Sequence, residues 1–274
     1  MLPGRSASLI GIEKNIKMFS LTGKTAIVTG GGSGIGRAIA QLFAKQGAWV
    51  YILDFDEKGA ENVAKEIMEK GGNASAIKCD VSNQLVVSDI VKSIVSQRNS
   101  IDILVNNAGV AHVGNVEGTS EEDFTRLFNV NVKGAYNLLH AVIPFMKEKG
   151  GAILNIASIA SSVGIPDRFA YSMTKGAVVG MTLSTAKDYI NNNIRCNCIS
   201  PARVHTPFVD GFIAKNYPGK EKEMFEKLSK TQPIGRMAQP EEIANLVLYL
   251  CSDEASFITG CDYPIDGGFI KLNN

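Results

Sequence analysis

The 274-residue chain lacks the features that mark several protein classes. No stretch approaches the roughly 18 consecutive apolar residues that a membrane-spanning helix needs. The 28 lysines and arginines nearly balance the 27 aspartates and glutamates, so the net charge is +1. Nucleic-acid-binding domains usually carry a strong basic excess, which is missing here. We therefore expect neither a membrane nor a nucleic acid as a partner.

Cysteine and histidine are sparse and scattered. The 5 cysteines form no C-x-x-C pair, so we expect no disulfide framework and infer a reducing, cytoplasmic compartment. The 3 histidines, His112, His140 and His205, lie far apart and show no metal-ligand spacing. The sequence thus predicts no metal site.

Residues 1–17 contain no apolar segment long enough for a secretory signal. Because Met18 offers a second start, we expect residues 1–18 to be a poorly ordered N-terminal extension or the product of a misassigned start codon. At about 100–200 residues per domain, the length allows one large or two small domains. We expect one domain over residues 19–274.

Short apolar, β-branched runs alternate with longer helical patterns along the chain. Predicted strands cover residues 25–29, 49–53, 75–79, 101–105, 152–157, 194–199 and 262–265. Predicted helices cover residues 35–46, 57–70, 84–97, 121–149, 170–191 and 240–250. Strands that are apolar on both faces and separated by helices indicate a parallel sheet covered on two sides. The pattern predicts one Rossmann-type, doubly wound α/β domain with a seven-stranded parallel sheet and helices on both faces.

Residues 206–236 interrupt this alternation. They are rich in proline and glycine and include one charged helical stretch, GKEKEMFEKLSK. Long irregular insertions in compact domains are usually functional. Since the segment follows the strand ending at Ile199, we expect a substrate-binding loop or lid; a solvated surface excursion is the alternative.

A glycine-rich turn, TGGGSGIG at residues 29–36, lies between the first strand and the first helix. A pyrophosphate needs a close backbone approach without Cβ atoms and a helix N-terminus that points at it, and this turn supplies both. No Gly-Lys-Ser/Thr follows, so it is not a Walker loop. Ser33 also lacks the G-x-S-x-G surroundings of a nucleophile elbow. The turn predicts dinucleotide binding.

Asp54 stands 18 residues after Gly36, at the end of the second predicted strand. A carboxylate at this place accepts hydrogen bonds from the adenosine ribose hydroxyls. It would repel a 2′-phosphate by about 1–4 kcal/mol. We therefore predict NAD in preference to NADP; an exposed aspartate that merely begins a turn is the alternative.

Tyr171 and Lys175, in YSMTK, are spaced i and i+4, on one face of a predicted helix. Lowering a phenol pKa from 10 to near neutrality takes about 4 kcal/mol of phenolate stabilisation. An ammonium and an oxidised nicotinamide together supply such stabilisation. Ser158 adds a hydroxyl at the end of the 152–157 strand, where open α/β sheets bind ligands.

These motifs, in this order, resemble the compact, single-domain branch of the short-chain dehydrogenase/reductase family from Phe19 to Asn274. The resemblance rests on TGGGSGIG, Asp80 in CDV, NNAG at 106–109, NVKG at 131–134, Ser158, YSMTK and DGG at 266–268. It implies that Tyr171 is the acid/base, that Lys175 lowers its pKa and binds the nicotinamide ribose, and that Ser158 orients the substrate oxygen. It further implies that Asn131 holds a proton-relay water.

The same resemblance implies a cofactor site. Its expected members are Gly30, Ser33, Gly34, Ile35, Gly36, Asp54, Asp80, Val81, Asn107, Ala108, Gly109, Tyr171, Lys175, Pro201, Val204 and Thr206. Asp80 is expected at the adenine, Asn106 on the adenosine side of the cleft and Thr206 at the nicotinamide carboxamide.

One position departs from the family pattern. Pro201 is followed by Ala202 instead of glycine, and then by Arg203, where relatives often have an apolar residue. Arginine recognises carboxylates with two parallel hydrogen bonds. Arg203 therefore indicates either an anionic or polyhydroxylated substrate or a salt bridge to a loop carboxylate.

The resemblance leaves three functional hypotheses. The first is an NAD-dependent dehydrogenase that interconverts a secondary alcohol and a ketone on a small polar substrate such as a sugar, sugar acid or polyol. The second is a 3-oxoacyl-[acyl-carrier-protein] reductase-like enzyme, and the third a non-catalytic, NAD-binding redox sensor. By analogy with relatives, a homotetramer (or dimer) is expected.

Overall fold

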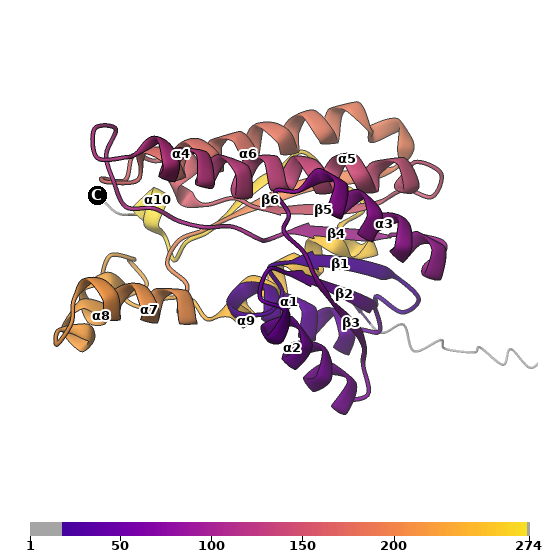
Figure 1. Ribbon diagram of the computed structural model, residues 1–274, viewed down its shortest axis with the longest axis horizontal. Coiled ribbons are helices and arrows are strands. Elements are labelled where there is room, and N and C mark those ends of the chain that lie inside the picture. Colours follow the sequence, from indigo (N-terminus) through magenta and orange to yellow (C-terminus); the bar gives the residue numbers. More distant parts are fainter. Residues whose placement is uncertain (1–17, 273–274) are drawn as a thin grey trace, which may run out of the picture.

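The computed structural model describes residues 18–272 (Figure 1). Apart from Met18, the N-terminal extension predicted for residues 1–18 lies outside the described residues. Within them, no helix is both long and apolar enough to cross a membrane. All five cysteines carry free thiols.

A seven-stranded parallel sheet forms the centre of the domain, as predicted. Its strands are β1 (Thr25–Thr29), β2 (Trp49–Asp54), β3 (Asn73–Lys78), β4 (Ile103–Asn106), β5 (Gly151–Ile156), β6 (Ile194–Pro201) and β7 (Asp262–Ile265). They lie in the order β3-β2-β1-β4-β5-β6-β7. The strand order reverses between β1 and β4, and open α/β sheets bind ligands at the carboxyl ends of the strands beside such a reversal.

Helices cover both faces of the sheet (Figure 1). The α-helices are α1 (Gly34–Lys45), α2 (Glu57–Glu69), α3 (Gln84–Arg98), α4 (Glu121–Leu127), α5 (Gly134–Met146), α6 (Phe169–Asp188), α7 (Pro207–Asn216), α8 (Glu221–Ser229), α9 (Pro240–Cys251) and α10 (Phe269–Leu272). Successive residues of β1 point to opposite faces: Val28 packs with the core beneath α1, α2 and α9, and Ile27 with the core beneath α3 and α5. This alternation is why the strands are apolar on both faces.

The region predicted as one helix over residues 121–149 is not uniform. Helix α4 passes into a π-helical turn at Phe128–Lys133 before α5 continues to Met146. A π-helical turn re-aims the side chains on its wide turn and is frequent at functional sites. The single-helix prediction is therefore wrong at this turn, which contains Asn131.

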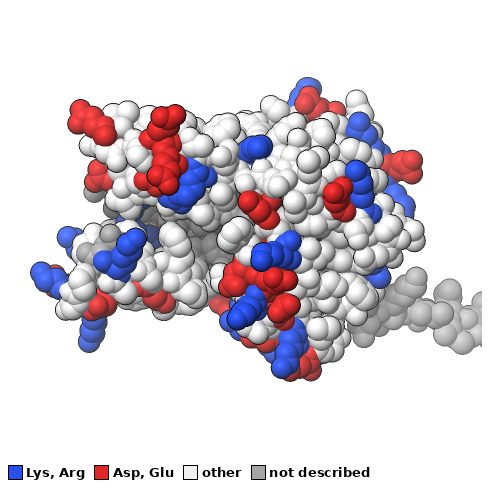
Figure 2. All heavy atoms as spheres, viewed as in Figure 1, with Lys and Arg blue, Asp and Glu red and all other residues white. Residues whose placement is uncertain are grey.

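Residues 206–236, hereafter the arm, contain two helices, α7 and α8, where the sequence predicted one. Thr206 caps α7 by accepting a hydrogen bond from Val209 N, and Pro207 occupies its first turn. The arm projects from the domain in Figure 1, and Figure 2 shows the surface hollowed between it and the rest of the molecule. Acidic and basic side chains are interspersed over the face seen in Figure 2.

Candidate active site

The glycine-rich turn after β1 has the shape that a pyrophosphate requires. Gly30 and Gly34 have φ values of +63° and +51°, in the left-handed region that favours glycine. A Cβ on Gly30 would lie 2.9 Å from Ala108 Cα, and one on Gly36 would overlap Gly30 O. Ser33 and Ile35 flank the first residue of α1, so the N-terminus of that helix opens at the turn. These residues fit a dinucleotide.

Asn107 holds this turn in place. Its Nδ2 donates to Thr29 O at 2.9 Å and to Gly30 O at 3.0 Å. The Thr29 hydroxyl in turn accepts hydrogen bonds from the backbone N–H groups of Asn107 and Ala108, both at 3.0 Å. The NNAG motif thus joins the ends of β1 and β4. The side-chain nitrogen of Asn107 is occupied by hydrogen bonds to the backbone of the turn.

Asp54 lies directly against the glycine turn. Its Oδ2 accepts a hydrogen bond from Gly32 N at 2.8 Å, and its Oδ1 accepts one from Asp56 N at 2.9 Å. A Cβ on Gly32 would lie 2.9 Å from Asp54 Oδ2. The carboxylate is therefore held at the end of β2, beside the turn, as the sequence predicted.

Arg37, the nearest arginine to this carboxylate in sequence, is already engaged. Its Nη2 donates to both carboxylate oxygens of Glu66, at 3.0 and 2.8 Å. Gln41 donates to the same carboxylate at 2.8 Å. Helix α2 thus supplies the counter-charge of Arg37.

Tyr171 and Ser158 meet at the carboxyl end of β5. Tyr171 lies in the first turn of α6, and Ser158 follows β5 by two residues. Burial raises the pKa of Tyr171, whereas a hydrogen bond with Ser158 and the charge of Arg168 act to lower it. In the protein alone, burial prevails, so the phenol is protonated at neutral pH.

Lys175 lies one helical turn beyond Tyr171 and is buried, with 6% of its surface exposed. Its Nζ donates to Ile156 O at 2.7 Å and lies 5.7 Å from the centroid of the Tyr171 ring. Burial lowers the pKa of Lys175 to about 8. At pH 7 the group therefore remains mainly an ammonium.

Asn131 lies in the π-helical turn, close to Lys175. A Cβ on Gly109 would lie 3.2 Å from Asn131 Oδ1 and 3.6 Å from Lys175 Nζ, so these two atoms face the same point. Asn131 also donates to Thr174 Oγ1 at 3.1 Å. The four predicted catalytic residues are thus gathered at one place. A cavity of about 10 Å³, lined in part by Asn131 and Lys175, lies beside them.

The remaining predicted cofactor residues border the same sheet edge. Thr206 faces the glycine turn, since a Cβ on Gly34 would lie 3.3 Å from its Cγ2. Asp80 is exposed and accepts hydrogen bonds from the N–H and hydroxyl of Ser82, at 2.9 and 2.7 Å. Val81, Pro201 and Val204 are buried around the site.

Asn106 differs from its expected place on the adenosine side of the cleft. It is 7% exposed, and its Nδ2 donates to Asn155 Oδ1 at 2.8 Å. Asn155 donates in turn to Thr182 Oγ1 of α6, also at 2.8 Å. Because Asn106 is the last residue of β4, the alternation of the strand points its side chain into the layer between the sheet and α6.

Arg203 lies just beyond β6, and no carboxylate within residues 18–272 forms an ion pair with it. Its Nε donates to Thr231 Oγ1 at 3.0 Å, and its backbone N donates to Gln232 Oε1 at 2.8 Å. The salt bridge that the sequence left open is therefore not formed. Burial and the nearby charge of Arg168 both lower the pKa of Arg203.

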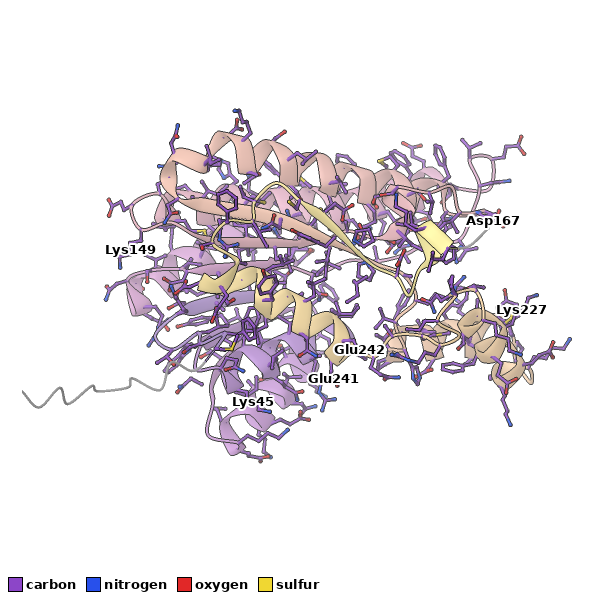
Figure 3. All side chains as sticks on the ribbon, turned by 180° about the vertical axis from the view of Figure 1, so that it is seen from behind. Lys45, Lys149, Asp167, Lys227, Glu241 and Glu242 are labelled. Carbon is purple, nitrogen blue, oxygen red and sulfur yellow. The ribbon has the colours of Figure 1, made fainter. Side chains whose placement is uncertain are left out.

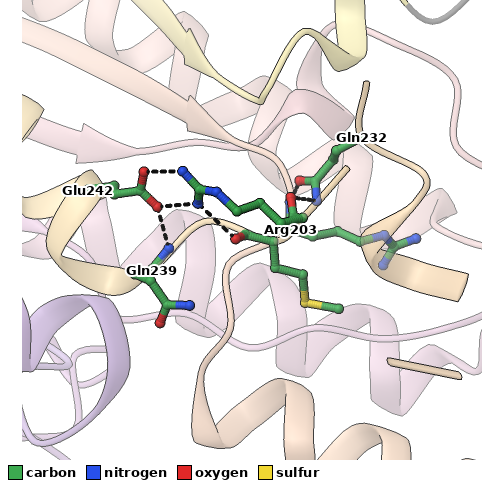
Figure 4. A network of polar contacts seen from close by, with 6 residues as sticks. Arg203, Gln232, Gln239 and Glu242 are labelled. Carbon is green, nitrogen blue, oxygen red and sulfur yellow. Dashed lines mark hydrogen bonds and ion pairs between the residues drawn. The ribbon is translucent and has the colours of Figure 1, made fainter. Parts of the chain in front are cut away.

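A polar network holds the C-terminal end of the arm (Figure 4). Gln232 Nε2 donates to Arg236 O at 2.9 Å. The two terminal nitrogens of Arg236 pair with the carboxylate of Glu242 at 2.7 and 2.8 Å, and Gln239 N donates to the same carboxylate at 2.8 Å. The hydrogen bonds with Arg236 and Gln239 lower the pKa of Glu242 to about 2. The arm thus joins α9 through a charged clamp.

Sequence reasoning missed two features that surround the catalytic residues. One is Arg168 at the start of α6, and its position three residues before Tyr171 could have indicated that it lies close to the phenol. Val110 has no polar side chain to attract attention, although its backbone fixes Asn131. No cluster of potential metal ligands occurs among the described residues.

Comparisons with known proteins show what the whole chain is similar to. A family model described as "Enoyl-(Acyl carrier protein) reductase" matches residues 30–270. The 2-keto-3-deoxy-L-fuconate dehydrogenase of Xanthomonas campestris pv. campestris is 38% identical over 253 residues, 91% of this chain and 81% of that protein. The 3-oxoacyl-[acyl-carrier-protein] reductase FabG of Thermotoga maritima is 36% identical over 251 residues, 91% of this chain and 99% of that protein.

A solved structure, L-sorbose reductase from Gluconobacter frateurii complexed with NADPH and L-sorbose, superimposes with a TM-score of 0.88. It is 32% identical in sequence, and the match covers 92% of this chain and 98% of that chain. The family model covers most of the chain, and these relatives are all more than 30% identical to it. The chain therefore belongs to the short-chain dehydrogenase/reductase family of oxidoreductases.

Proposed function

We propose that the protein is an NAD(H)-dependent dehydrogenase that interconverts a secondary alcohol and a ketone on a small polar substrate: a sugar, sugar acid or polyol. The observation that supports this most directly is the position of Tyr171 beside Ser158, which acts to lower the pKa of the phenol, with the ammonium of Lys175 buried 5.7 Å from the Tyr171 ring. In this arrangement Tyr171 would exchange a proton with the oxygen of an alcohol, close to the glycine turn that fits a dinucleotide.

Each of the site residues would have its own role in the reaction. A bound nicotinamide supplies the hydride acceptor or donor. Ser158 holds the substrate oxygen, and Tyr171 takes the hydroxyl proton during oxidation or returns it to the carbonyl oxygen during reduction. Lys175 keeps a positive charge beside the phenol, which favours the phenolate. Asn131, whose Oδ1 lies near the same point as Lys175 Nζ, would hold a water that relays protons between Lys175 and solvent.

Asp54 and Arg37 favour NAD over NADP in this proposal. The Asp54 carboxylate lies against Gly32, where it opposes a 2′-phosphate, and Arg37 is occupied by Glu66. The sorbose reductase structure holds NADPH, so cofactor choice differs within the family and has to be measured.

The relatives support the proposed substrate class, since their names include a dehydrogenase of a sugar acid and a reductase of a sugar. We propose that the arm closes the substrate side of the site as a lid, because it begins at Thr206 beside the glycine turn and borders the hollow. A cytoplasmic homotetramer (or dimer) remains our expectation. Light scattering after size exclusion tests the assembly, and a monomer would refute it.

A 3-oxoacyl-[acyl-carrier-protein] reductase-like activity is the second candidate, and the FabG relative favours it. Such enzymes generally use NADPH and offer arginine to an acidic carrier protein. Residues 131–149 and 172–192 carry lysines but no arginine, and Asp54 opposes NADPH. A redox sensor without turnover is the remote third candidate, and it would not need the assembled catalytic residues.

The decisive experiment measures NADH formation from NAD with purified protein. The substrates are sugars, sugar acids, polyols and a 3-hydroxyacyl thioester. Tyr171→Phe should lower kcat at least 1000-fold while NADH affinity stays within about twofold, because only the acid/base hydroxyl is removed. Tyr189→Phe, the same change just past the other end of α6, is the control and should turn over normally.

Each other outcome would revise the proposal. Turnover retained in Tyr171→Phe would remove Tyr171 from the acid/base role. Activity confined to the acyl thioester would favour the reductase-like candidate, and binding of NADH without any turnover would favour the sensor.

A further inference from the structure

Two arginines border the catalytic residues without an acidic partner. Arg168 caps the N-terminus of α6, three residues before Tyr171, and Arg203 lies two residues beyond β6. Within residues 18–272, no carboxylate forms an ion pair with either guanidinium. Arginines at partly buried positions are normally paired, because a buried charge without a partner is costly.

The backbone on both sides of Arg168 is fixed. Gly114 N donates to Asp167 O at 3.0 Å, and Phe169 N donates to Gly114 O at 3.1 Å, so residues 167–169 are bound to the loop that follows β4. Asp167 has a φ of +55°, a conformation that aspartate tolerates better than most residues. The backbone position of Arg168 is therefore built into the fold, and its guanidinium makes one hydrogen bond, from Nη1 to Asp167 O at 2.8 Å.

Arg203 is held from the arm side. Thr231 and Gln232, both in the arm, bond its Nε and its backbone N. These contacts use one of its five N–H donors on the side chain and leave the two terminal nitrogens without a carboxylate. Arg203 thus stands where the arm meets the end of β6.

The sheet brings Arg203 next to the segment that carries Ser158. Ile156 of β5 pairs with Ile199 of β6, so the segments that follow the two strands emerge side by side. One segment carries Ser158, and the other carries Arg203. The charge of Arg168 acts on both neighbours: it lowers the pKa of Arg203 and opposes the burial that raises the pKa of Tyr171.

Nearby acids do not neutralise this pair. Asp266 is engaged in capping the start of α10, where it accepts from Gly268 N and Ile270 N at 2.9 and 2.8 Å. Asp210 of the arm pairs with His205 at 3.0 Å. Asp167 is exposed at the outer edge of the molecule, opposite the arm that bears Lys227 (Figure 3). Within residues 18–272, neither guanidinium therefore has a carboxylate partner.

We propose that Arg168 and Arg203 bind the carboxylate of an acidic substrate, so that the preferred alcohol is a hydroxy acid of the sugar-acid type and not a neutral sugar or polyol. This inference rests on the proposed dehydrogenase function. Two planar guanidinium groups match the oxygens of a carboxylate and would fix its distance from Ser158 and Tyr171. An anion would also remove the repulsion between the two arginines.

The test compares matched acid and neutral substrates. We would measure kcat/KM with NAD for gluconate against sorbitol, and for 3-hydroxybutyrate against butan-2-ol. The wild type should prefer the acids by at least tenfold. Arg203→Gln and Arg168→Gln should each reduce that preference about 10- to 100-fold, as expected for a charge-assisted hydrogen bond. The preference of Arg203→Lys for acids should lie between those of the wild type and Arg203→Gln, because lysine keeps the positive charge but lacks the planar guanidinium.

Lys227→Gln is the matched control, since it removes one positive charge from the exposed face of α8 in the same arm. It should leave the preference for acids unchanged. A general loss of folding would lower kcat/KM for acid and neutral substrates alike, so the ratio separates a binding role from a structural one.

A second measurement does not depend on turnover. Calorimetry with Tyr171→Phe protein saturated with NAD should show gluconate binding at least tenfold tighter than sorbitol, and the added Arg203→Gln change should abolish the difference. Equal affinities, or an acid preference that survives both arginine changes, would overturn the anion site. A preference for sorbitol 6-phosphate over gluconate would overturn the choice of a carboxylate.

The two proposals can fail separately. If neutral alcohols are oxidised and acids are not preferred, the anion site falls and the dehydrogenase stands. If no alcohol of either kind is oxidised, the proposed function falls, and the calorimetry alone decides whether the arginines bind an anion.

Discussion

The side-chain amide of Asn131 pairs with both backbone polar atoms of Val110. Its Oδ1 accepts from Val110 N at 2.8 Å, and its Nδ2 donates to Val110 O at 2.9 Å. Asn131 is 3% exposed, so the pairing is shielded from water. It joins the π-helical turn to the loop that follows β4, and this loop borders Lys175, since a Cβ on Gly109 would lie 3.6 Å from Lys175 Nζ.

Asn131→Ala should destabilise the protein, because it leaves a backbone donor and a backbone acceptor without partners. We expect the free energy of unfolding to fall by about 2 kcal/mol in urea titrations. Asn129→Ala, a change of the same type in the same π-helical turn, should cost less than about 0.5 kcal/mol. Equal losses in the two variants would contradict the pairing.

Lys175→Met should change how stability depends on pH. The pKa of Lys175 is about 8 in the folded protein and 10.5 in the unfolded reference. Below pH 8 the buried ammonium therefore weakens the fold, and between pH 8 and 10.5 the unfolded chain binds more protons, so wild-type stability rises with pH. This rise amounts to at most about 3 kcal/mol.

The stability of Lys175→Met relative to wild type should accordingly fall by up to that amount between pH 8 and 10.5. The change of the difference with pH is the readout, because Met also loses the hydrogen bond to Ile156 O. Lys187→Met, an exposed change on the same helix, should show no such slope. A difference that stays constant over this pH range would contradict the lowered pKa.

Asp54→Asn should weaken the preference for NAD. The amide oxygen can still accept from Gly32 N, whereas the negative charge that opposes a 2′-phosphate is gone. We expect the ratio of kcat/KM for NAD to that for NADP to fall at least tenfold. Asp56→Asn removes an exposed carboxylate two residues away and should leave the ratio within about twofold; a drop of the same size there would show a general charge effect.

Glu242→Gln should loosen the C-terminal anchor of the arm. It breaks the two-point ion pair with Arg236 that joins the arm to α9. Trypsin should cleave the exposed lysines of α8 several-fold faster, as mapped by mass spectrometry. Glu241→Gln alters the neighbouring exposed acid and should cleave like wild type. Unchanged cleavage in Glu242→Gln would show that other contacts hold the arm.

Most of the fold could be predicted from the sequence, because the patterns that indicate strands and helices lie within short segments of the chain. Apolar runs and helical periods identified all seven strands and six of the helical regions, since burial on both faces of a parallel sheet leaves a direct trace in composition. The interruption at residues 128–133 left no such trace. A π-helical turn contains the same residues as the α-helix around it and arises from how those residues pack.

The candidate site, like the fold, could be predicted from the sequence only in part. Spacing within one segment was sufficient to predict the glycine turn, Asp54 at a strand end, and Tyr171 with Lys175 one helical turn apart. Sequence also allowed two readings of Arg203, and only the tertiary structure removed the salt bridge to a loop carboxylate. The distance between β6 and the acids of the arm depends on how the arm folds back.

The sequence by itself therefore determined the sheet, the cofactor turn and the family chemistry, because each depends on residue types at short spacing. Only the tertiary structure decided that Asn106 faces the protein interior, that Arg37 is occupied by Glu66, and that no carboxylate within residues 18–272 forms an ion pair with Arg168 or Arg203. The physical reason is that charge compensation depends on which side chains become neighbours in space. Arg37 and Glu66, for example, come from two different helices, and Asn106 and Asn155 from two different strands.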